Sequence, residues 1–244
     1  MKDSKGNPKV IFFDTETTGL KPGNICQLTY IIANEEGVKA KNFFFKVDFV
    51  SPHAAKVHGF TKEILEKLSN GKRFNQFSKE IYEDFESADF IVGHNVSFDR
   101  KFLDKELERN RKFLTNKEYF CTMWHFKDEV GKKPKLTELG KFLGVDEKEM
   151  QNFAQNLFSD DSTKAHDARY DTVLTYLSWK KGLELGKISP EIFNIKNLDK
   201  YINPEYIQKD ATINNVQLKK ASAKIDNGIF SKVKVSEKSY LPNI

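Results

Sequence analysis

The chain has 244 residues, of which 39% are apolar and 31% charged, with a net charge of +5 and an isoelectric point near 8.9. No apolar run approaches the roughly 18 residues that span a bilayer, and the first residues lack the apolar core of a signal peptide, so we expect neither a membrane protein nor a secreted one. Two cysteines, Cys26 and Cys121, are too few for a disulfide framework or a thiolate metal site, which favours a cytoplasmic protein with core thiols.

The first predicted element is a buried strand over residues 9–17 that ends in two acids. Its residues Val10–Phe13 are β-branched or aromatic on both faces, as in a central strand covered on both sides. Asp14 and Glu16 are two positions apart and therefore point to one face, roughly 7 Å from each other along the strand. Buried acids need compensation of their charge, so these two can bind cations together. The alternative is an edge strand whose acidic end is solvated.

Two further strands and a short helix follow. Residues 25–33 and 42–47 are rich in Ile, Tyr, Phe and Val with a polar turn between them, and we expect the first strand to pair with the second. Thr61 is a good N-cap for a helix that reaches Leu68. His58 precedes this helix beside a glycine, so we expect it in a loop as a turn histidine.

The middle of the chain contains the third acid. Residues 75–87 have apolar side chains at helical spacing, which predicts an amphipathic helix packed on the sheet. Residues 89–95 predict a short buried strand, followed by a helix over residues 98–111 with Ser97 as its cap. Asp99 would lie in the first turn of this helix, just past a strand end. Open α/β sheets present their sites there, and the helix dipole favours a carboxylate.

Short helices are expected over residues 135–143 and 152–158, followed by a polar break over residues 159–162. A long helix then follows, whose apolar positions are Val173, Leu174, Leu177, Leu183 and Leu185.

The start of the long helix carries a histidine and the fourth acid. If His166 and Asp171 were both helical they would be about 140° apart around the axis and could not face one site. Asp167 is a good N-cap. We therefore expect His166 in the loop before the helix and Asp171 in its second turn.

Three separated motifs resemble those of the DnaQ-like, or DEDDh, family of 3'-5' exonucleases. In chain order they are residues 13–20 (FDTETTGL), residues 94–99 (HNVSFD), and His166 with four residues before Asp171. The resemblance covers residues 9–186 and includes the loop at residues 57–61; within the family, the chain is similar to the proofreading epsilon subunit of bacterial DNA polymerase III. It implies an RNase H-like α/β fold, with a mixed central β-sheet flanked by α-helices.

The resemblance also implies two bound divalent cations and hydrolysis of nucleotides from a 3' end. Converging acids repel one another unless cations neutralise them, and oxygen ligands without thiolates select Mg²⁺ or Mn²⁺ over zinc. Two such ions can stabilise the attacking and the leaving oxygen of a phosphodiester. The metal ligands would be Asp14, Glu16, Asp99 and Asp171, with Asp14 bridging both ions. His166 would be the general base that deprotonates the attacking water.

Substrate contacts are carried over from the family by position. The backbone after Glu16, at Thr17, would hold the terminal nucleotides, Leu20 would wedge between them, and Phe98 would line the nucleotide pocket. Asn95 and His58 complete the expected substrate-binding residues, whereas His94 is expected to form hydrogen bonds at the strand end.

The last part of the chain differs in charge from the rest. From residue 187 on, ten lysines outnumber six acids, so most of the basic excess lies there. We therefore divide the chain into an exonuclease domain, residues 1–186, and a C-terminal appendage, residues 187–244. The appendage could be a small ordered unit, a segment that docks a partner, or a basic contact to nucleic acid; the resemblance to the family favours docking to a DNA polymerase subunit. The protein would then trim single-stranded DNA from its 3' end, as in proofreading during DNA replication.

Two alternatives stay open. One is a 3'-5' exoribonuclease of the RNase T or oligoribonuclease type, because recognition of a 2'-hydroxyl depends on contacts that the sequence does not display. The other is a catalytically silent module that keeps the fold to bind nucleic acid or a polymerase.

Overall fold

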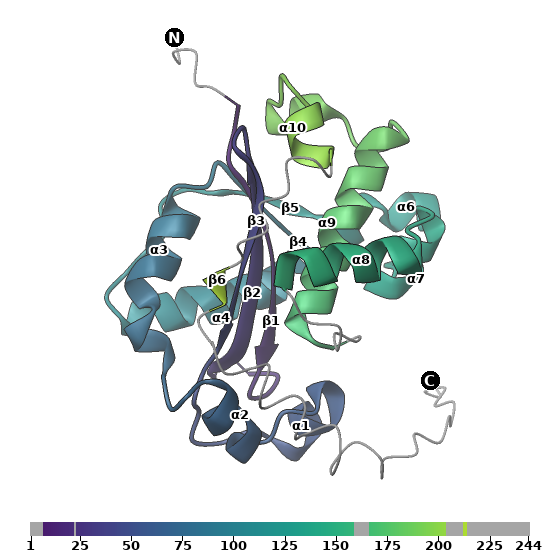
Figure 1. Ribbon diagram of the computed structural model, residues 1–244. Coiled ribbons are helices and arrows are strands. Elements are labelled where there is room, and N and C mark those ends of the chain that lie inside the picture. Colours follow the sequence, from purple (N-terminus) through teal and green to yellow (C-terminus); the bar gives the residue numbers. More distant parts are fainter. Residues whose placement is uncertain (1–6, 22, 159–165, 204–211, 214–244) are drawn as a thin grey trace. The chain divides into compact units, whose positions relative to one another are not determined.

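A mixed six-stranded sheet runs through the computed structural model, which describes residues 7–21, 23–158, 166–203 and 212–213 (Figure 1). The strand order is β5-β4-β1-β2-β3-β6. The strands are β1 (Val10–Thr17), β2 (Ile25–Asn34), β3 (Gly37–Phe44), β4 (Phe90–Gly93), β5 (Glu118–Cys121) and β6 (Thr212–Ile213). The predicted antiparallel pairing of the first two strands is confirmed, and β2 pairs in the same way with β3.

Ten helices and two 3-10 turns are assigned in the described residues. They are α1 (Pro52–His58), α2 (Lys62–Leu68), η1 (Phe74–Gln76), α3 (Ser78–Glu86), α4 (Val96–Arg109), α5 (Thr122–His125), α6 (Lys127–Val130), α7 (Leu136–Phe142), α8 (Glu147–Phe158), α9 (Ala168–Glu184), η2 (Pro190–Phe193) and α10 (Asp199–Ile202). Within this part of the chain, no helix is both long enough and apolar enough to cross a membrane.

The direction of the strands gathers their carboxyl ends at one edge of the sheet. β1, β4 and β5 are parallel neighbours, so all three end at the same edge. α4 and α5 begin within a few residues of the ends of β4 and β5. The chain segments that follow these strands are therefore brought together where Asp14 and Glu16 end β1.

Each face of the sheet has its own apolar core. Val10 and Phe12 pack with α7, α8 and α9 on one face, whereas Ile11 and Phe13 pack with α3 and α4 on the other. Figure 1 shows α8 and α9 on one side of the sheet and α3 on the other. Since strand side chains alternate, Asp14 follows Phe12 onto the face that α9 covers.

Several predicted boundaries are wrong because the apolar pattern extends beyond the hydrogen-bonded element. The third strand, expected over residues 42–47, begins at Gly37, directly after the two-residue turn, and ends at Phe44. Phe45 and Val47 are buried outside it. The helix expected over residues 75–87 is divided into η1 and α3.

The starts of two helices also differ from the prediction. α4 begins at Val96, because Asn95 takes the left-handed conformation at its N-cap; Ser97 lies inside the helix. α8 begins five residues before the expected Asn152. Thr61 is the N-cap of α2 as predicted, and Cys26 is a buried thiol on β2. Leu185, expected at an apolar position of the long helix, is exposed just beyond its end. The polar break at residues 159–162 lies outside the described residues.

The apolar core between the sheet and α9 extends to residues that follow α9. Ile188, Phe193, Ile195 and Tyr201 are buried in the same apolar cluster as α9, and the Tyr201 hydroxyl donates to the carbonyl of Pro8. Residues 188–202 therefore pack with the domain that precedes them, although the sequence analysis assigned them to the appendage.

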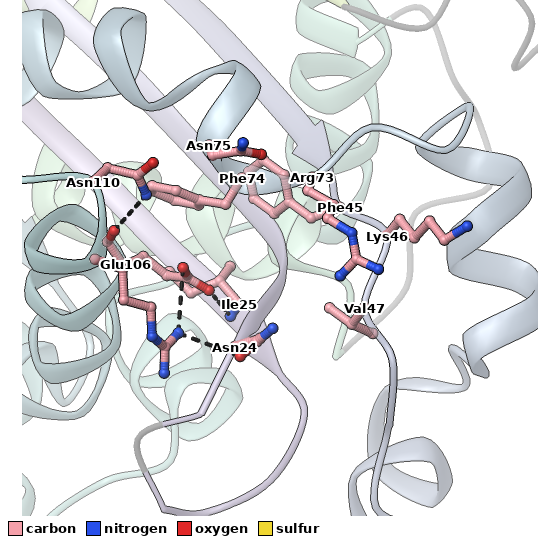
Figure 2. A pocket seen from close by; sticks show the side chains of 11 residues that line it. Asn24, Ile25, Phe45, Lys46, Val47, Arg73, Phe74, Asn75, Glu106 and Asn110 are labelled. Atoms are coloured by element: carbon pink, nitrogen blue, oxygen red, sulfur yellow. Dashed lines mark hydrogen bonds and ion pairs between the residues drawn. The ribbon is translucent and has the colours of Figure 1, made fainter.

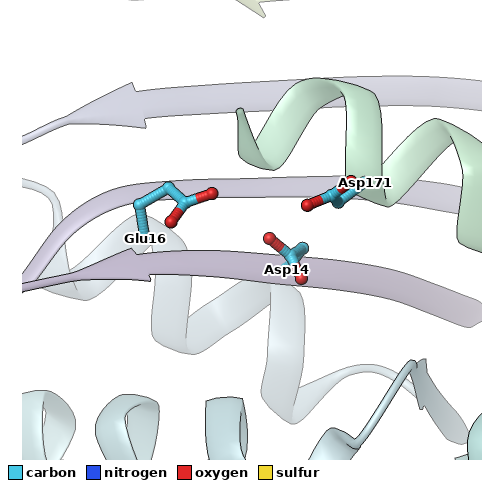
Figure 3. Close-up of side chains that lie close together, drawn as sticks. All are labelled: Asp14, Glu16 and Asp171. Atoms are coloured by element: carbon cyan, nitrogen blue, oxygen red, sulfur yellow. The ribbon is translucent and has the colours of Figure 1, made fainter. Parts of the chain in front are cut away.

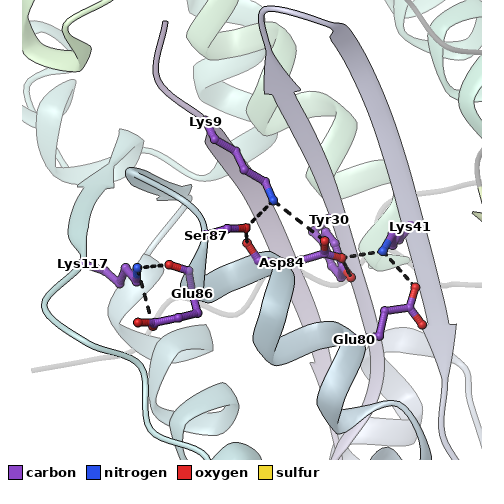
Figure 4. Close-up of polar contacts among 8 residues, drawn as sticks. All are labelled: Lys9, Tyr30, Lys41, Glu80, Asp84, Glu86, Ser87 and Lys117. Carbon is purple, nitrogen blue, oxygen red and sulfur yellow. Dashed lines mark hydrogen bonds and ion pairs between the residues drawn. The ribbon is translucent and has the colours of Figure 1, made fainter. Parts of the chain in front are cut away.

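A polar network attaches α3 to the sheet (Figure 4). Asp84 on α3 accepts hydrogen bonds from the Tyr30 hydroxyl at 2.7 Å and from Lys41 Nζ at 2.6 Å, and Lys41 also donates to Glu80 at 2.9 Å. Burial lowers the pKa of Lys41, but its hydrogen bonds to the two acids outweigh burial and the pKa is raised. Asp84 thus satisfies two polar groups of β2 and β3 at once.

We expect Asp84→Ala to lower the free energy of unfolding by about 2 kcal/mol, because the buried Tyr30 hydroxyl and part of the Lys41 charge lose their partner. Urea unfolding at pH 7 measures this change. The matched control is Asp128→Ala, whose side chain is 97% exposed and should change stability by less than about 0.5 kcal/mol. Equal stabilities of the two variants would contradict the assigned role.

Candidate active site

Three of the four predicted acids meet at the carboxyl end of β1 (Figure 3). Asp14 and Glu16 of β1 and Asp171 of α9 each place a carboxylate oxygen within 4.8 Å of the others. Asp171 lies in the first turn of α9 and not in the second, since the helix begins only at Ala168. Three hard oxygen donors at this spacing can hold a cation such as Mg²⁺ or Mn²⁺.

The fourth acid, Asp99, adjoins this group. It lies in the first turn of α4, as predicted, and is only 4% exposed. Its Oδ1 accepts hydrogen bonds from the backbone N–H of Thr15 at 3.1 Å and from the Thr15 hydroxyl at 2.6 Å. Since Thr15 separates Asp14 from Glu16 along β1, these bonds fix Asp99 against the same strand end.

The four acids oppose one another's ionisation. Burial, followed by the charges of Asp99, Asp171 and Glu16, raises the pKa of Asp14 well above its usual range. Burial also raises the pKa of Glu16, with a further contribution from Asp171. Burial raises the pKa of Asp99 to about 7 against the hydrogen bonds from Thr15. Bound cations would relieve this repulsion, which is the electrostatic reason that the cluster fits a metal site.

The pKa of Asp171 is raised to about 7 from 3.8, first by burial and then by the charge of Asp167. The folded protein therefore keeps a proton that the unfolded chain releases, so metal-free stability falls as pH rises between about 4 and 7. Asparagine cannot ionise. We expect metal-free Asp171→Asn to exceed the wild type in stability by on the order of 2 kcal/mol at pH 8 and to match it near pH 4.

Urea unfolding in EDTA at both pH values checks this expectation. Added Mn²⁺ should reverse the order at pH 8, because only the wild type keeps the full ligand set. A variant no more stable than the wild type at pH 8 would show that the cluster carries no electrostatic strain.

His166 lies in a turn directly before α9, which confirms its predicted position. It is exposed and adopts a left-handed backbone with φ of 64°. A backbone hydrogen bond from His166 stabilises the Asp171 carboxylate and partly offsets the rise of its pKa. The backbone of His166 is thus held beside the acid cluster, and the residue is open to solvent.

Four of the five expected substrate-binding residues line one open hollow of about 150 Å³ beside the acids. They are Thr17, Leu20, His58 and Phe98, and Glu16 borders the same hollow. The Leu20 side chain is 75% exposed. Asn95 does not belong to this lining: it is the N-cap of α4, where its carbonyl accepts the Phe98 N–H at 2.8 Å.

The sequence predicts His58 in a loop, and this prediction is wrong. His58 is the last residue of α1 and is buried. Its Nδ1 accepts the Phe60 N–H at 3.0 Å, which leaves Nε2 to donate to the Thr17 carbonyl at 3.2 Å. Burial lowers the pKa of His58 and favours this neutral form. The histidine therefore holds the backbone of Thr17 beside the acids.

Helix α1 supplies the part of the hollow that sequence reasoning missed, with the lining residues His53, Ala54 and Val57. A signal was present. Ser51 is an N-cap whose side chain accepts the Ala54 N–H, and Pro52 occupies the first helical position. A capping serine followed by proline is typical of a helix start.

Two other features are structural. His94 contacts the Thr122 hydroxyl and the Pro134 carbonyl, each at 3.0 Å, and so forms the strand-end hydrogen bonds expected of it. A larger hollow of about 530 Å³ lies near the start of β2 (Figure 2). Within it, Glu106 accepts the Ile25 N–H and pairs with Arg109. Its lining contains none of the expected site residues.

Solved structures of exonuclease I resemble this fold. One exonuclease I structure has 20% sequence identity and a TM-score of 0.57, covering 77% of this chain and 43% of that chain. The zinc-bound complex of Escherichia coli exonuclease I with single-stranded DNA has 19% identity and a TM-score of 0.54, with 74% and 41% covered. Exonuclease I from Methylocaldum szegediense has 20% identity and a TM-score of 0.52, covering 77% of this chain and 42% of that chain.

This chain therefore spans less than half the length of these exonuclease I chains, and at such identity the likeness concerns the fold. It confirms the predicted RNase H-like α/β class. No curated protein sequence matches the chain. The family model described as "Exonuclease" matches residues 11–177, from β1 into α9 and through all four acids and His166. Because this match covers more than half of the sequence, the chain belongs to the exonuclease family.

Proposed function

We propose that the protein is a metal-dependent 3'-5' exonuclease that releases nucleoside monophosphates from single-stranded DNA. The observation that carries this proposal is the convergence of Asp14, Glu16 and Asp171 within 4.8 Å of one another. The open hollow beside them, with Leu20 and Phe98 on its wall, offers a place for the end of a strand.

Mg²⁺ or Mn²⁺ fits this donor set, because all donors are carboxylate oxygens and their mutual repulsion needs positive charge. Two such cations, when bound, stabilise charge on the attacking and the leaving oxygen of a phosphodiester. Asp14 would contact both of them, and Glu16, Asp99 and Asp171 would share the remaining positions. Burial, together with repulsion from the neighbouring acids, raises the pKa of Asp14 and Glu16, and a bound cation would relieve both costs.

His166 is the proposed general base. As an exposed residue at the rim of the cluster, it can take a proton from the attacking water on an imidazole nitrogen and pass it to solvent. Thr17, held by His58, would orient the terminal nucleotide through its backbone. Leu20 and Phe98 would contact the bases of the last nucleotides.

Single-stranded DNA is the preferred substrate class in this proposal. Exonuclease I of Escherichia coli, which shares the fold with a TM-score of 0.56, has been solved in complex with a dT13 oligonucleotide. The test compares matched single-stranded DNA and RNA oligomers, each labelled at the 5' end, with Mg²⁺, with Mn²⁺ and with EDTA. We expect metal-dependent shortening from the 3' end that is faster on DNA.

Faster trimming of RNA would instead identify an exoribonuclease. No metal-dependent trimming of either oligomer at high protein concentration would support the silent binding module.

We further propose that the protein works in the cytoplasm, and that its last residues dock a DNA polymerase subunit, as in a proofreading exonuclease similar to the epsilon subunit. Because residues 188–202 pack in the domain core, the informative truncation is after Asn203. It should keep full activity on short oligomers and lose the polymerase subunit in a pull-down, and an unaltered pull-down would reject docking.

A further inference from the structure

Gln27 is a buried amide on β2 that connects the sheet to the start of α9. It lies opposite Glu16 in the register of β1 and β2 and has no exposed surface. Its Oε1 accepts the backbone N–H of Ala168 at 3.1 Å, and its Nε2 donates to Asp167 Oδ1 at 3.0 Å. Both ends of the amide therefore contact the first residues of α9.

Further hydrogen bonds fix the two groups that Gln27 connects. On the strand side, its Nε2 also donates to Asn42 Oδ1 at 3.0 Å, and this oxygen accepts the Thr29 hydroxyl at 2.7 Å. On the helix side, Asp167 accepts Arg169 Nε at 2.9 Å and Arg169 Nη2 at 2.6 Å. All five side chains are buried, so their geometry is held by direct bonds.

Asp167 is the N-cap of α9 and the immediate neighbour of His166. His166 lies outside the helix with a left-handed backbone, and its side chain is exposed. His166 is therefore held in two ways: its backbone hydrogen-bonds to the Asp171 carboxylate, and its neighbour Asp167 is bound by Gln27.

The position of Asp171 is fixed by contacts that do not involve Gln27. It lies inside α9, where the next residue, Thr172, donates to the Thr29 carbonyl at 3.3 Å and Val173 is fully buried. Loss of the Gln27 amide should therefore move His166 more than Asp171.

From this arrangement we propose that Gln27 is a positioning residue, which sets the place of His166 by binding Asp167 and the first N–H of α9. The inference rests on the proposed function, in which His166 is the base. Reactive groups must be placed closely, and a shift of about 1 Å can reduce a rate by about 10²-fold. Gln27 would act on the reaction rate and not on the metal site.

The test is a double-mutant cycle with Gln27→Met and His166→Ala. We expect Gln27→Met alone to lower kcat by about 10- to 100-fold, with KM for a DNA oligomer and the Kd for Mn²⁺ within about twofold of wild type. In the His166→Ala background, Gln27→Met should cause no further loss, because the group that it positions is gone. Gln27→Glu, which keeps the acceptor but places a second acid against Asp167, should behave in the same way.

Asp84→Ala is the control for stability, since Asp84 belongs to the α3 network on the other face of the sheet. It should lower stability without changing kcat. An equal loss from Gln27→Met in both backgrounds, or an unchanged kcat in the single variant, would overturn the proposal.

A readout without catalysis separates this proposal from the proposed function. In the metal-free protein, Gln27→Met should shift or broaden the imidazole NMR resonances of His166 and leave those of His94 unchanged. If the wild type has no nuclease activity, the proposed function fails, and the His166 resonances still decide whether Gln27 positions this histidine. Unchanged His166 resonances would reject the positioning role.

Discussion

Replacing His166 by alanine should lower the rate of cleavage by about 10²- to 10⁴-fold while leaving the Kd for Mn²⁺ within about twofold of wild type. The structure gives a reason why the cleavage rate and the Mn²⁺ affinity should respond differently. The acids that can hold a cation together lie on β1 and α9, and Asp99 of α4 adjoins them, whereas His166 lies in the turn before α9 with its side chain exposed. Its removal deletes a proton acceptor and no carboxylate.

Single-turnover cleavage of a labelled DNA oligomer measures the rate, and calorimetry measures Mn²⁺ binding. The matched control is His125→Ala: this histidine lies on α5, where its Nε2 contacts the Lys187 carbonyl at 2.9 Å, and the variant should keep the wild-type rate. Unchanged turnover in His166→Ala would remove it as the base. A parallel loss of Mn²⁺ affinity would assign it to the metal site instead.

Local rules predicted the parts of the site that depend on neighbouring residues. The alternation of β1 placed Asp14 and Glu16 on one face, and the N-cap preference of Asp167 placed His166 outside α9; the structure has both arrangements. The strand predicted before the helix at residues 98–111 placed Asp99 in the first helical turn, where the structure has it. Each inference uses only residues within one element or at its ends.

Contacts between distant segments could not be predicted in this way. Gln27 lies 140 residues from Asp167, and in the sequence it is one polar residue among apolar ones on β2. Phe45 and Val47 look like strand residues, but they are buried by packing after β3 has ended. A hydrophobic pattern indicates which residues are buried. Where a strand ends and which buried polar groups pair depend on the segment that packs against it.

Burial of β1 on both faces makes an acid on this strand costly for stability. Asp14 follows Phe12 on a strand buried on both faces, so an acid there lowers the stability of the metal-free fold. The pKa of each of the four acids is raised, first by burial, which is the direction that this cost requires. In the proposed function, bound cations would compensate this cost.

Asp14→Ala should abolish both Mn²⁺ binding and cleavage. Asp14 is the acid whose pKa is raised, after burial, by each of the other three, Asp99, Asp171 and Glu16, which identifies it as the electrostatic centre of the cluster. Removing the central ligand leaves the remaining acids without a shared one, so we expect a loss of at least about 10³-fold in cleavage. Calorimetry with Mn²⁺ and single-turnover cleavage measure the two losses.

Metal-free stability separates this loss of binding from unfolding. Because the acid with a raised pKa destabilises the metal-free fold at neutral pH, metal-free Asp14→Ala should melt no lower than the wild type at pH 8. The control Asp104→Ala removes a half-exposed acid of α4 that pairs with Arg100, and it should retain both metal binding and cleavage. Normal Mn²⁺ affinity in Asp14→Ala would contradict its proposed place between the two cations, whereas lost affinity in a stable protein would show that β1 carries the metal site.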